Sequence, residues 1–195
     1  MSAVHGLVLA GGRSTRMGRD KAALGWQGRP ALERAFDLLS SVTERAFVSL
    51  RADQADDPLR ASHPHIVDGE TGSGPIAGIA AAQAAFPEAA WLVLACDLPF
   101  ADRATLEHLL ARRDPGRPAT AYRSAHDGLP EPLCAIWEPS SREPLIEFVA
   151  TGRHCPRKFL IQSAAALVDL PDPRALDNVN TPAELAAARA ALEAG

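Results

Sequence analysis

Apolar residues occur along the chain in short continuous runs, each about as long as one buried strand. These runs predict strands at Gly6–Ala10, Ala46–Leu50, Trp91–Cys96, Ala119–Tyr122, Leu133–Trp137 and Ala166–Leu170. Between most of them, apolar residues three and four positions apart predict helices at Ala31–Leu39, Pro75–Ala85, Arg103–Arg112, Glu143–Ala150 and Pro182–Leu192. Asp102 and Thr181 stand where the N-caps of two of these helices are expected.

The alternation of strands and helices predicts the fold class. Strands that are apolar throughout, rather than at every second position, are typical of parallel sheets with helices on both faces. We therefore expect an α/β fold with a mostly parallel central sheet, which binds ligands at the carboxyl ends of its strands. The alanine-rich segment 183–194 is expected to form a terminal helix docked on the sheet.

Composition narrows the class of protein. The chain has 195 residues, 47% of them hydrophobic, which is the usual size of one domain and predicts a single domain over residues 1–195. A net charge of -4 provides no global positive field, so we expect no nucleic-acid partner.

Cysteine content and the N-terminal run bear on location. Three cysteines, an odd number without disulfide density, fit a reducing cytoplasm better than secretion. The N-terminal apolar run is interrupted by His5 and Gly6 and ends in glycines, which predicts a buried strand rather than a signal peptide or a membrane span. We therefore expect a cytoplasmic protein that does not bind membranes.

The segment that follows the first strand, LVLAGGRSTRMGRDK, is typical of a phosphate-binding loop. Gly11 and Gly12 allow the backbone to turn sharply and to approach a ligand closely. The cations Arg13, Arg16 and Lys21 follow within ten residues. Backbone amides and several positive charges in one loop suit a triphosphate, whose negative charge grows on the departing pyrophosphate.

This loop matches neither of the two commonest phosphate motifs. A Walker loop has four residues between its glycines and then Lys and Ser or Thr, whereas five residues separate Gly12 from Gly18, and Arg19 and Asp20 come next. The dinucleotide fingerprint Gly-x-Gly-x-x-Gly is absent from this segment. A glycine turn with solvated basic residues is the alternative, which the combination of glycines and cations disfavours.

The string LAGGRSTRMGRDK resembles the signature loop of the MobA family, the molybdenum cofactor guanylyltransferases, within the superfamily of nucleotidyltransferases. Further similar segments follow in the same order. They are GPIAGIAAA at 74–82, ACDLPF at 95–100, EPLCAIW at 131–137 and DNVNTPAEL at 177–185. The resemblance therefore spans almost the whole chain.

The resemblance implies a Rossmann-like three-layer sandwich, GTP and a molybdopterin-bearing acceptor as substrates, Mg²⁺ as cofactor, and transient contacts with proteins that deliver and accept the cofactor. It implies nucleotide binding by Leu9, Ala10, Gly11, Gly12, Lys21, Ser49, Asp68 and Asp97. We expect Arg16, Lys21 and Asp97 to be the catalytic residues, and Asp97 and Asn180 to be metal ligands.

Asp97 follows the apolar run Trp91–Cys96 directly, which places its carboxylate at the carboxyl end of a buried strand. Mg²⁺ prefers one or two carboxylates together with phosphate oxygens and water. A turn or cap before Pro99 is the alternative, but Asp102 is better placed to cap the following helix. These features agree with the role in metal binding that the resemblance implies for Asp97.

Three further assignments leave alternatives open. Asn180 could bind the metal through its amide oxygen or could hold a phosphate, but Asn and Thr before Pro182 also make a good helix start. The resemblance places Asp68 in GTP binding, and a plain turn residue explains it equally well. Ser49 stands where the family commonly has an asparagine that contacts the nucleotide, and this departure puts that contact in doubt.

Other polar residues give weaker indications. His63 and His65 have no third ligand nearby and are expected in a solvated loop. Cys96 is expected to serve packing, and Cys134 has no neighbouring histidine in sequence to act as a base. A basic group, which could contact the phosphate of the acceptor or form a solvated face, comprises Arg153, His154, Arg157 and Lys158.

The expected reaction is transfer of GMP from GTP to the terminal phosphate of molybdopterin. Two alternatives remain: a cytidylyltransferase that modifies the same cofactor, and a module that binds nucleotide or cofactor without turnover. The guanine branch is favoured by Gly11, where the cytosine branch typically has alanine, and by the GPIAG segment. Lys21 and Asp97 argue against loss of turnover.

Overall fold

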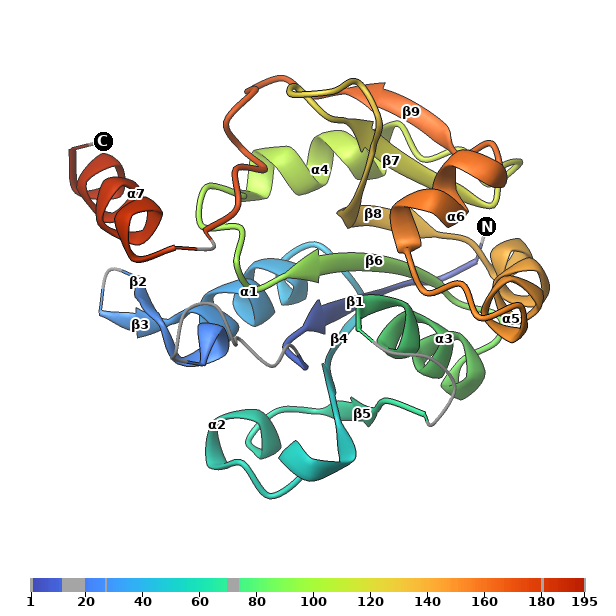
Figure 1. Cartoon of the computed structure of the whole chain (residues 1–195), viewed down its shortest axis with the longest axis horizontal. Helices are drawn as coiled ribbons and strands as arrows, with labels where there is room; N and C mark the ends of the chain where they lie inside the picture. The colour runs from blue at the N-terminus through green and yellow to red at the C-terminus, as the bar shows by residue number, and fades with distance from the viewer. Residues whose placement is uncertain (1, 12–19, 27, 70–73, 180, 195) are drawn as a thin grey trace.

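The sheet is the centre of the fold. The structure, a computed structural model, describes residues 2–11, 20–26, 28–69, 74–179 and 181–194. Within these ranges, seven strands form one sheet in the order β5-β4-β1-β6-β8-β7-β9 (Figure 1). Their bounds are β1 Val4–Leu9, β4 Arg45–Leu50, β5 His65–Val67, β6 Ala90–Ala95, β7 Ala119–Arg123, β8 Pro130–Trp137 and β9 Ala166–Asp169.

The strand directions confirm the predicted, mostly parallel sheet. β1 pairs in parallel with β4 and β6, β4 with β5, and β7 with β9. β8 runs antiparallel to both of its neighbours, β6 and β7. The half of the sheet built from β5, β4, β1 and β6 therefore has all of its carboxyl ends at one edge, as ligand-binding α/β folds require.

Helices cover both faces of the sheet and produce three layers (Figure 1). α1 (Ala31–Ser40) and α4 (Arg103–Ala111) pack on one face, and α3 (Pro75–Ala85), α5 (Arg142–Ala150) and α6 (Pro156–Gln162) pack on the other. Successive residues of β6 alternate between the faces because side chains of a strand point in opposite directions. Leu92 and Leu94 join the first core, whereas Trp91 and Val93 join the second.

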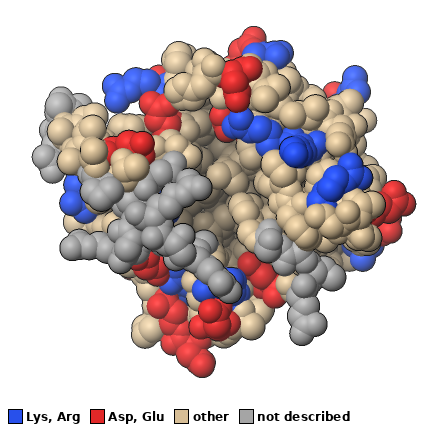
Figure 2. All heavy atoms as spheres, in the orientation of Figure 1, with Lys and Arg blue, Asp and Glu red and all other residues tan. Residues whose placement is uncertain are grey.

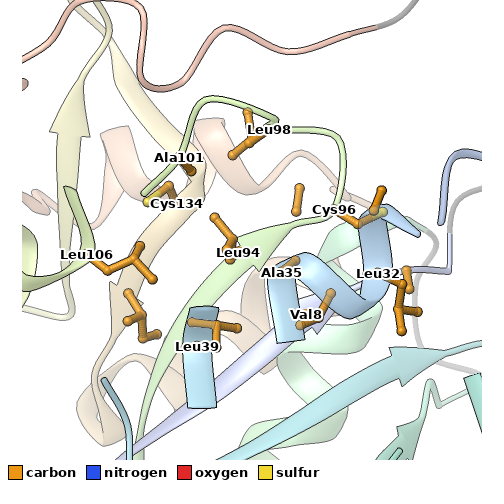
Figure 3. Packing of buried hydrophobic residues seen from close by; sticks show 14 of the residues in the cluster. Val8, Leu32, Ala35, Leu39, Leu94, Cys96, Leu98, Ala101, Leu106 and Cys134 are labelled. Carbon is orange, nitrogen blue, oxygen red and sulfur yellow. The ribbon is translucent and has the colours of Figure 1, made fainter. Parts of the chain in front are cut away.

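Figure 3 shows the packing of the first core, in which side chains of α1 meet the sheet. Leu32 and Leu39 of α1 are fully buried in this cluster together with Val8 of β1. Cys96 and Cys134 belong to the same cluster. Burial raises the pKa of both thiols to about 12, so neither is a thiolate near neutral pH. The predicted packing role of Cys96 is confirmed, and Cys134 is not suited to nucleophilic attack.

The predicted N-caps are present. The Asp102 carboxylate accepts a hydrogen bond from the Thr105 backbone at 2.8 Å at the start of α4. Thr181 precedes α7 (Pro182–Ala194), and its hydroxyl accepts from the Glu184 backbone at 3.2 Å. The Glu184 carboxylate in turn accepts from the Thr181 backbone at 3.1 Å, which completes a capping box.

The predicted terminal helix is present, and its residue Ala188 belongs to the first core, against which Leu185 and Leu192 also pack. α7 lies beside a small two-stranded ribbon formed by β2 (Gly25–Trp26) and β3 (Arg29–Pro30) (Figure 1). Arg189 donates to the Gly25 carbonyl from two of its nitrogens, at 3.2 and 3.0 Å. An alanine-rich helix buries little area per residue, so a polar contact of this kind helps to hold it at the edge of the fold. No helix in the described ranges is both long and apolar enough to span a membrane.

Candidate functional site

The candidate site lies where three parallel strands end side by side. The register pairs Leu9 of β1 with Ser49 of β4 and with Ala95 of β6, so these three strands finish at the same level. The connection from β1 to β4 passes through α1 on one face, and the connection from β5 to β6 passes through α3 on the other. Such a reversal of direction opens a crevice at the carboxyl ends of the strands.

Lys21 and Asp97 meet at this edge although 76 positions separate them in sequence. The Lys21 Nζ donates to Asp97 Oδ2 at 2.8 Å, and the side chains are 19% and 16% exposed. Lys21 begins a short 3-10 helix, η1 (Lys21–Ala23), and Asp97 follows β6. The pair therefore combines a cation and a carboxylate in surroundings that are mostly shielded from water, where charge interactions are stronger than at an open surface.

A divalent cation fits the chemistry of Asp97. Its Oδ1 is buried and has no hydrogen-bond partner among the described residues. Leaving a buried carboxylate oxygen without a partner is unfavourable, and a cation would satisfy it. Within the described ranges no three His, Cys, Asp or Glu side chains are grouped to hold a metal. A cation held by one carboxylate together with phosphate oxygens and water needs no such group.

Gly11, Ser49 and Asp68 form a second group at the same edge. The Ser49 hydroxyl donates to Asp68 Oδ1 at 2.6 Å, and Ser49 is 1% exposed. A Cβ added to Gly11 would lie 3.2 Å from Asp68 Oδ2, so this glycine lets the first loop approach the carboxylate. The burial of Ser49 favours a role behind Asp68, which it orients, over the direct nucleotide contact that the resemblance suggested.

Gly78 explains why Ser49 can occupy this place. A Cβ at position 78 would come within 2.1 Å of the Ser49 hydroxyl and 3.2 Å of Asp68 Oδ1. The first of these separations is far below any contact that real side chains make, so only glycine lets α3 pack this closely against β4. The second glycine of GPIAG thus serves close packing beneath Asp68.

Burial raises the pKa of the Asp68 carboxyl above its ordinary value of 3.8, although the Ser49 hydrogen bond and the charge of Arg51 oppose the shift. A raised pKa in the folded state means that ionisation of Asp68 opposes folding. The stability that the neutral carboxyl provides is present below pH 3.8 and is lost as pH rises through the folded-state pKa.

Asp68→Asn should therefore raise the melting temperature near neutral pH, because an amide cannot ionise and its oxygen can still accept from Ser49. The gain should shrink as pH falls. Thermal unfolding of both proteins across acidic and neutral pH measures this dependence. If the difference in melting temperature between Asp68→Asn and the unchanged chain grows on acidification, burial of the ionised Asp68 carboxylate is not the cause of the higher stability.

Two arginines near the first loop, Arg51 and Arg60, were not predicted from the sequence to belong to the site. Arg51 donates to the carbonyl of Gly11 and forms a two-pronged ion pair with Asp53 at 2.9 and 3.0 Å. Arg60 and Asp20 form a second two-pronged pair at 2.7 and 2.8 Å. Burial by itself would raise the pKa of Asp20, but hydrogen bonds and charge from Arg60 outweigh it and lower that pKa.

A hollow of about 550 Å³ lies between β8 and α7, and Phe100 and Val179 are part of its lining. The Val179 amide, in its lining, donates to the Asp97 carbonyl at 3.1 Å. Arg157 also lines it and pairs with Asp127 at 2.7 Å and with Glu131 at 3.1 Å. Figure 2 shows this face hollowed near its middle, with Lys and Arg side chains gathered on one side.

The structure separates the predicted basic group. Arg157 lies in the first turn of α6 and lines the hollow, whereas Arg153 precedes α6 and bonds to Thr151 and Gln162. The guanidinium of Arg153 also stacks over the Phe148 ring, 4.4 Å from its centroid. Of these two arginines, only Arg157 therefore lines the hollow.

Some of the remaining residues that were predicted from the sequence lie within the described ranges, and others lie outside them. Leu9 ends β1 and Ala10 follows it directly, where the Ala10 amide donates to the Ser49 carbonyl at 3.2 Å. Gly12, Arg16 and Asn180 lie outside the described residues, so their roles stay predictions. The ring of His63 lies tilted against that of Phe36 at a centroid distance of 4.4 Å, and His65 begins β5, so neither residue stands in the solvated loop that was predicted.

The sequence of the chain is similar to those of several known proteins. A molybdenum cofactor guanylyltransferase of Pseudomonas aeruginosa is 37% identical over 185 residues, which cover 92% of this chain and 91% of the relative. A molybdenum cofactor biosynthesis bifunctional protein of Synechocystis is 35% identical over 179 residues, covering 92% of this chain. The chain spans only 52% of that longer protein.

Solved structures support the fold. The crystal structure of molybdopterin-guanine dinucleotide biosynthesis protein A from Archaeoglobus fulgidus superposes with a TM-score of 0.83 at 24% identity, covering 98% of this chain and 100% of that one. The MobA-like NTP transferase domain matches residues 6–167, which include the first loop, Lys21, Asp68 and Asp97. The chain therefore belongs to the MobA-like NTP transferase family.

Proposed function

We propose that residues 1–195 act as one domain that transfers GMP from GTP to the terminal phosphate of molybdopterin. The products are the guanine dinucleotide form of the cofactor and pyrophosphate. The observation that carries the proposal is the Lys21–Asp97 pair at the carboxyl ends of β1 and β6, in a chain of the MobA-like family. The choice of GTP as nucleotide and of molybdopterin as acceptor is based on relatives that are named molybdenum cofactor guanylyltransferases.

The reaction forms one bond and breaks one. An oxygen of the acceptor phosphate attacks the α-phosphorus of GTP, and the bond from that phosphorus to the bridging oxygen of the β-phosphate breaks. Pyrophosphate leaves with the bonding electron pair. The attacking phosphate oxygen is already ionised near neutral pH, so the proposal assigns no residue the role of general base.

Positioning and charge neutralisation carry the catalysis in this proposal. The Lys21 ammonium stabilises negative charge on the phosphates as pyrophosphate departs. Asp97 holds Lys21 in place through Oδ2 and would bind Mg²⁺ through Oδ1, which has no other partner among the described residues. Mg²⁺ bound there would add positive charge beside the phosphate oxygens. Arg16 is included among the catalytic residues on the basis of the sequence alone.

Nucleotide selection is assigned to the group formed by Gly11, Ser49 and Asp68. The carboxylate of Asp68, held by the Ser49 hydroxyl, faces the first loop at Gly11. An alanine at position 11, which the cytosine branch typically carries, would place its methyl 3.2 Å from Asp68 Oδ2 and narrow this space. A purine needs more room than a pyrimidine, so the glycine supports GTP.

The acceptor is assigned to the hollow between β8 and α7. A backbone hydrogen bond from Val179, which lines this hollow, to the Asp97 carbonyl supports this assignment. Arg157 offers a guanidinium in the lining, and an arginine fork suits a phosphate. The volume of about 550 Å³ is in the range of pockets that bind small molecules.

Pyrophosphate release tests this proposal. The purified chain is incubated with Mg²⁺ and molybdopterin and with GTP, CTP, ATP or UTP in separate reactions. Release that requires both molybdopterin and GTP supports the assignment. Release with CTP alone would identify a cytidylyltransferase, and nucleotide binding without any pyrophosphate would identify a binding module.

A further inference from the structure

Arg60 is a charged side chain in the interior of the protein. It lies in the short helix α2 (Pro58–Ala61), which Asp57 caps, and it is 1% exposed. A buried guanidinium destabilises a protein unless its charge and its hydrogen-bond donors are matched by partners. The partners of Arg60 therefore indicate why the side chain is kept in the interior.

Arg60 contacts residues at both ends of the first loop. Nε and Nη2 donate to the carbonyl of Ala10 at 3.2 and 3.0 Å. Nη1 and Nη2 donate to the two carboxylate oxygens of Asp20 at 2.7 and 2.8 Å. Nη1 also donates to Asp57 at 3.2 Å. Ala10 directly follows β1 and Asp20 directly precedes Lys21, so one guanidinium links both sides of the first loop.

Because Asp20 caps the short helix that begins at Lys21, the position of Asp20 also fixes the backbone of Lys21. Its carboxylate accepts from the Ala22 amide at 3.1 Å and its carbonyl accepts from the Ala23 amide at 3.2 Å, so Asp20 is the N-cap of η1. Lys21 is the first residue of η1, and its ammonium reaches Asp97. A shift of Asp20 would therefore move the backbone from which the Lys21 side chain extends.

We propose that Arg60 is a positioning residue for nucleotidyl transfer, which sets the place of Lys21 by fixing Asp20 relative to the end of β1. Arg60 itself is buried and does not touch the substrates. This role rests on the proposed function for the identity of the substrates, whereas the contacts that define it involve only side chains and backbone of this chain.

The geometry requires arginine. The guanidinium is a rigid planar fork that serves the Ala10 carbonyl on one side and both oxygens of Asp20 on the other. A lysine ammonium keeps the charge, but it is a single point that cannot present two parallel donors to a carboxylate while also reaching the carbonyl. Arg60→Lys therefore keeps the positive charge but removes the paired hydrogen bonds, so it tests the positioning role without a change of charge.

The first test compares Arg60→Lys and Arg60→Gln with a matched control. Arg113 is also an arginine in a two-pronged pair, with Glu138 at 2.6 and 2.7 Å, and it bonds to Ser2 before β1 begins, away from the carboxyl ends of the strands. Arg60 variants should lower kcat by about tenfold to hundredfold, as a small displacement of a catalytic group does, with a smaller change in KM for GTP.

Arg113→Gln should lower the melting temperature and leave kcat unchanged. An Arg60→Lys protein with the kcat of the unchanged chain would overturn the proposal. So would an equal fall of kcat in the Arg113 control, since that would show that any lost buried ion pair has the same effect.

A double substitution tests the path through Asp20. If Arg60 acts on Lys21 through Asp20, Asp20→Asn should reproduce most of the loss in kcat. Adding Arg60→Gln to Asp20→Asn should then lower kcat little further, because residues that act as one unit are not additive. Fully additive losses would show that Arg60 influences the reaction by another route.

Amine acylation followed by mass spectrometry gives a readout that needs no substrate. The chain contains two lysines, Lys21 and Lys158, and Lys158 is exposed on α6, so it serves as an internal reference. The acylation rate of Lys21 relative to Lys158 should rise severalfold in both Arg60 variants and stay unchanged in Arg113→Gln. An unchanged ratio in the Arg60 variants would refute the positioning role.

Measuring both kcat and the acylation ratio distinguishes failure of the proposed function from failure of the positioning role of Arg60. If the unchanged chain makes no product from GTP and molybdopterin, the proposed function fails, and the acylation ratio still reports on the position of Lys21. If product forms and the Arg60 variants match the unchanged chain in both kcat and acylation ratio, the positioning role fails and the proposed function stands.

Discussion

Asp97→Asn is expected to lower kcat/KM for GTP by about 10²-fold to 10³-fold or more, the loss seen when one preorganised electrostatic contact is removed from an active site. The amide has nearly the same shape as the carboxylate, so the fold should persist. What it lacks is the negative charge that holds Lys21 at 2.8 Å and that a divalent cation would use at Oδ1. Steady-state release of pyrophosphate, together with thermal unfolding, measures both effects.

Asp102→Ala is the control for this prediction. Asp102 lies five positions further along the same loop and caps α4 through the Thr105 amide. Its loss should lower stability by about 1 kcal/mol, the usual effect of removing a cap, without lowering kcat. Near-normal turnover by Asp97→Asn at ordinary Mg²⁺ would remove Asp97 from the site. An unfolded Asp97→Asn protein would instead show that the residue is mainly structural.

Lys21→Ala is expected to lower kcat by about 10²-fold or more and to weaken GTP binding less than that. The ammonium is assigned to charge that grows as pyrophosphate departs, and such a contact strengthens in the transition state. Lys21→Arg should restore little activity, because a planar fork does not fit where a compact ammonium sits beside Asp97. Single-turnover rates and GTP dissociation constants for both variants separate chemistry from binding.

One pattern would contradict the role of Lys21. If Lys21→Ala reaches the full maximal rate and only requires more GTP, the ammonium contributes equally to ground-state and transition-state binding. The cation would then be part of the nucleotide-binding surface, and the stabilisation of departing pyrophosphate would have to come from other groups.

Much of the fold follows from apolar patterning. The run at 91–96 and the helix at 75–85 were predicted within one residue of β6 and α3, because long buried segments leave a clear signal. α6 was not predicted, since Arg157 and Lys158 interrupt its apolar face within a single short helix. The strands β2 and β3 have two residues each, too few for any pattern to emerge.

The site was predictable only in part. Position after a buried strand placed Asp97 at the ligand edge, and glycines with cations marked the first loop. The contact between Lys21 and Asp97 depends on how η1 folds back, which no local pattern encodes. Arg60 follows Pro58 in a charged segment and looks like an ordinary solvated arginine. Its burial becomes visible only when Ala10 and Asp20 are seen around it.

The fate of the phosphates of GTP tests the central claim most directly. The chain is incubated with Mg²⁺, molybdopterin and GTP labelled either at the α-phosphate or at the γ-phosphate, and the cofactor product is separated and counted. Guanylyl transfer predicts that the α-label appears in the molybdopterin product and that the γ-label appears only in pyrophosphate. A γ-label in the cofactor, or an α-label that never leaves the nucleotide pool, would contradict the account.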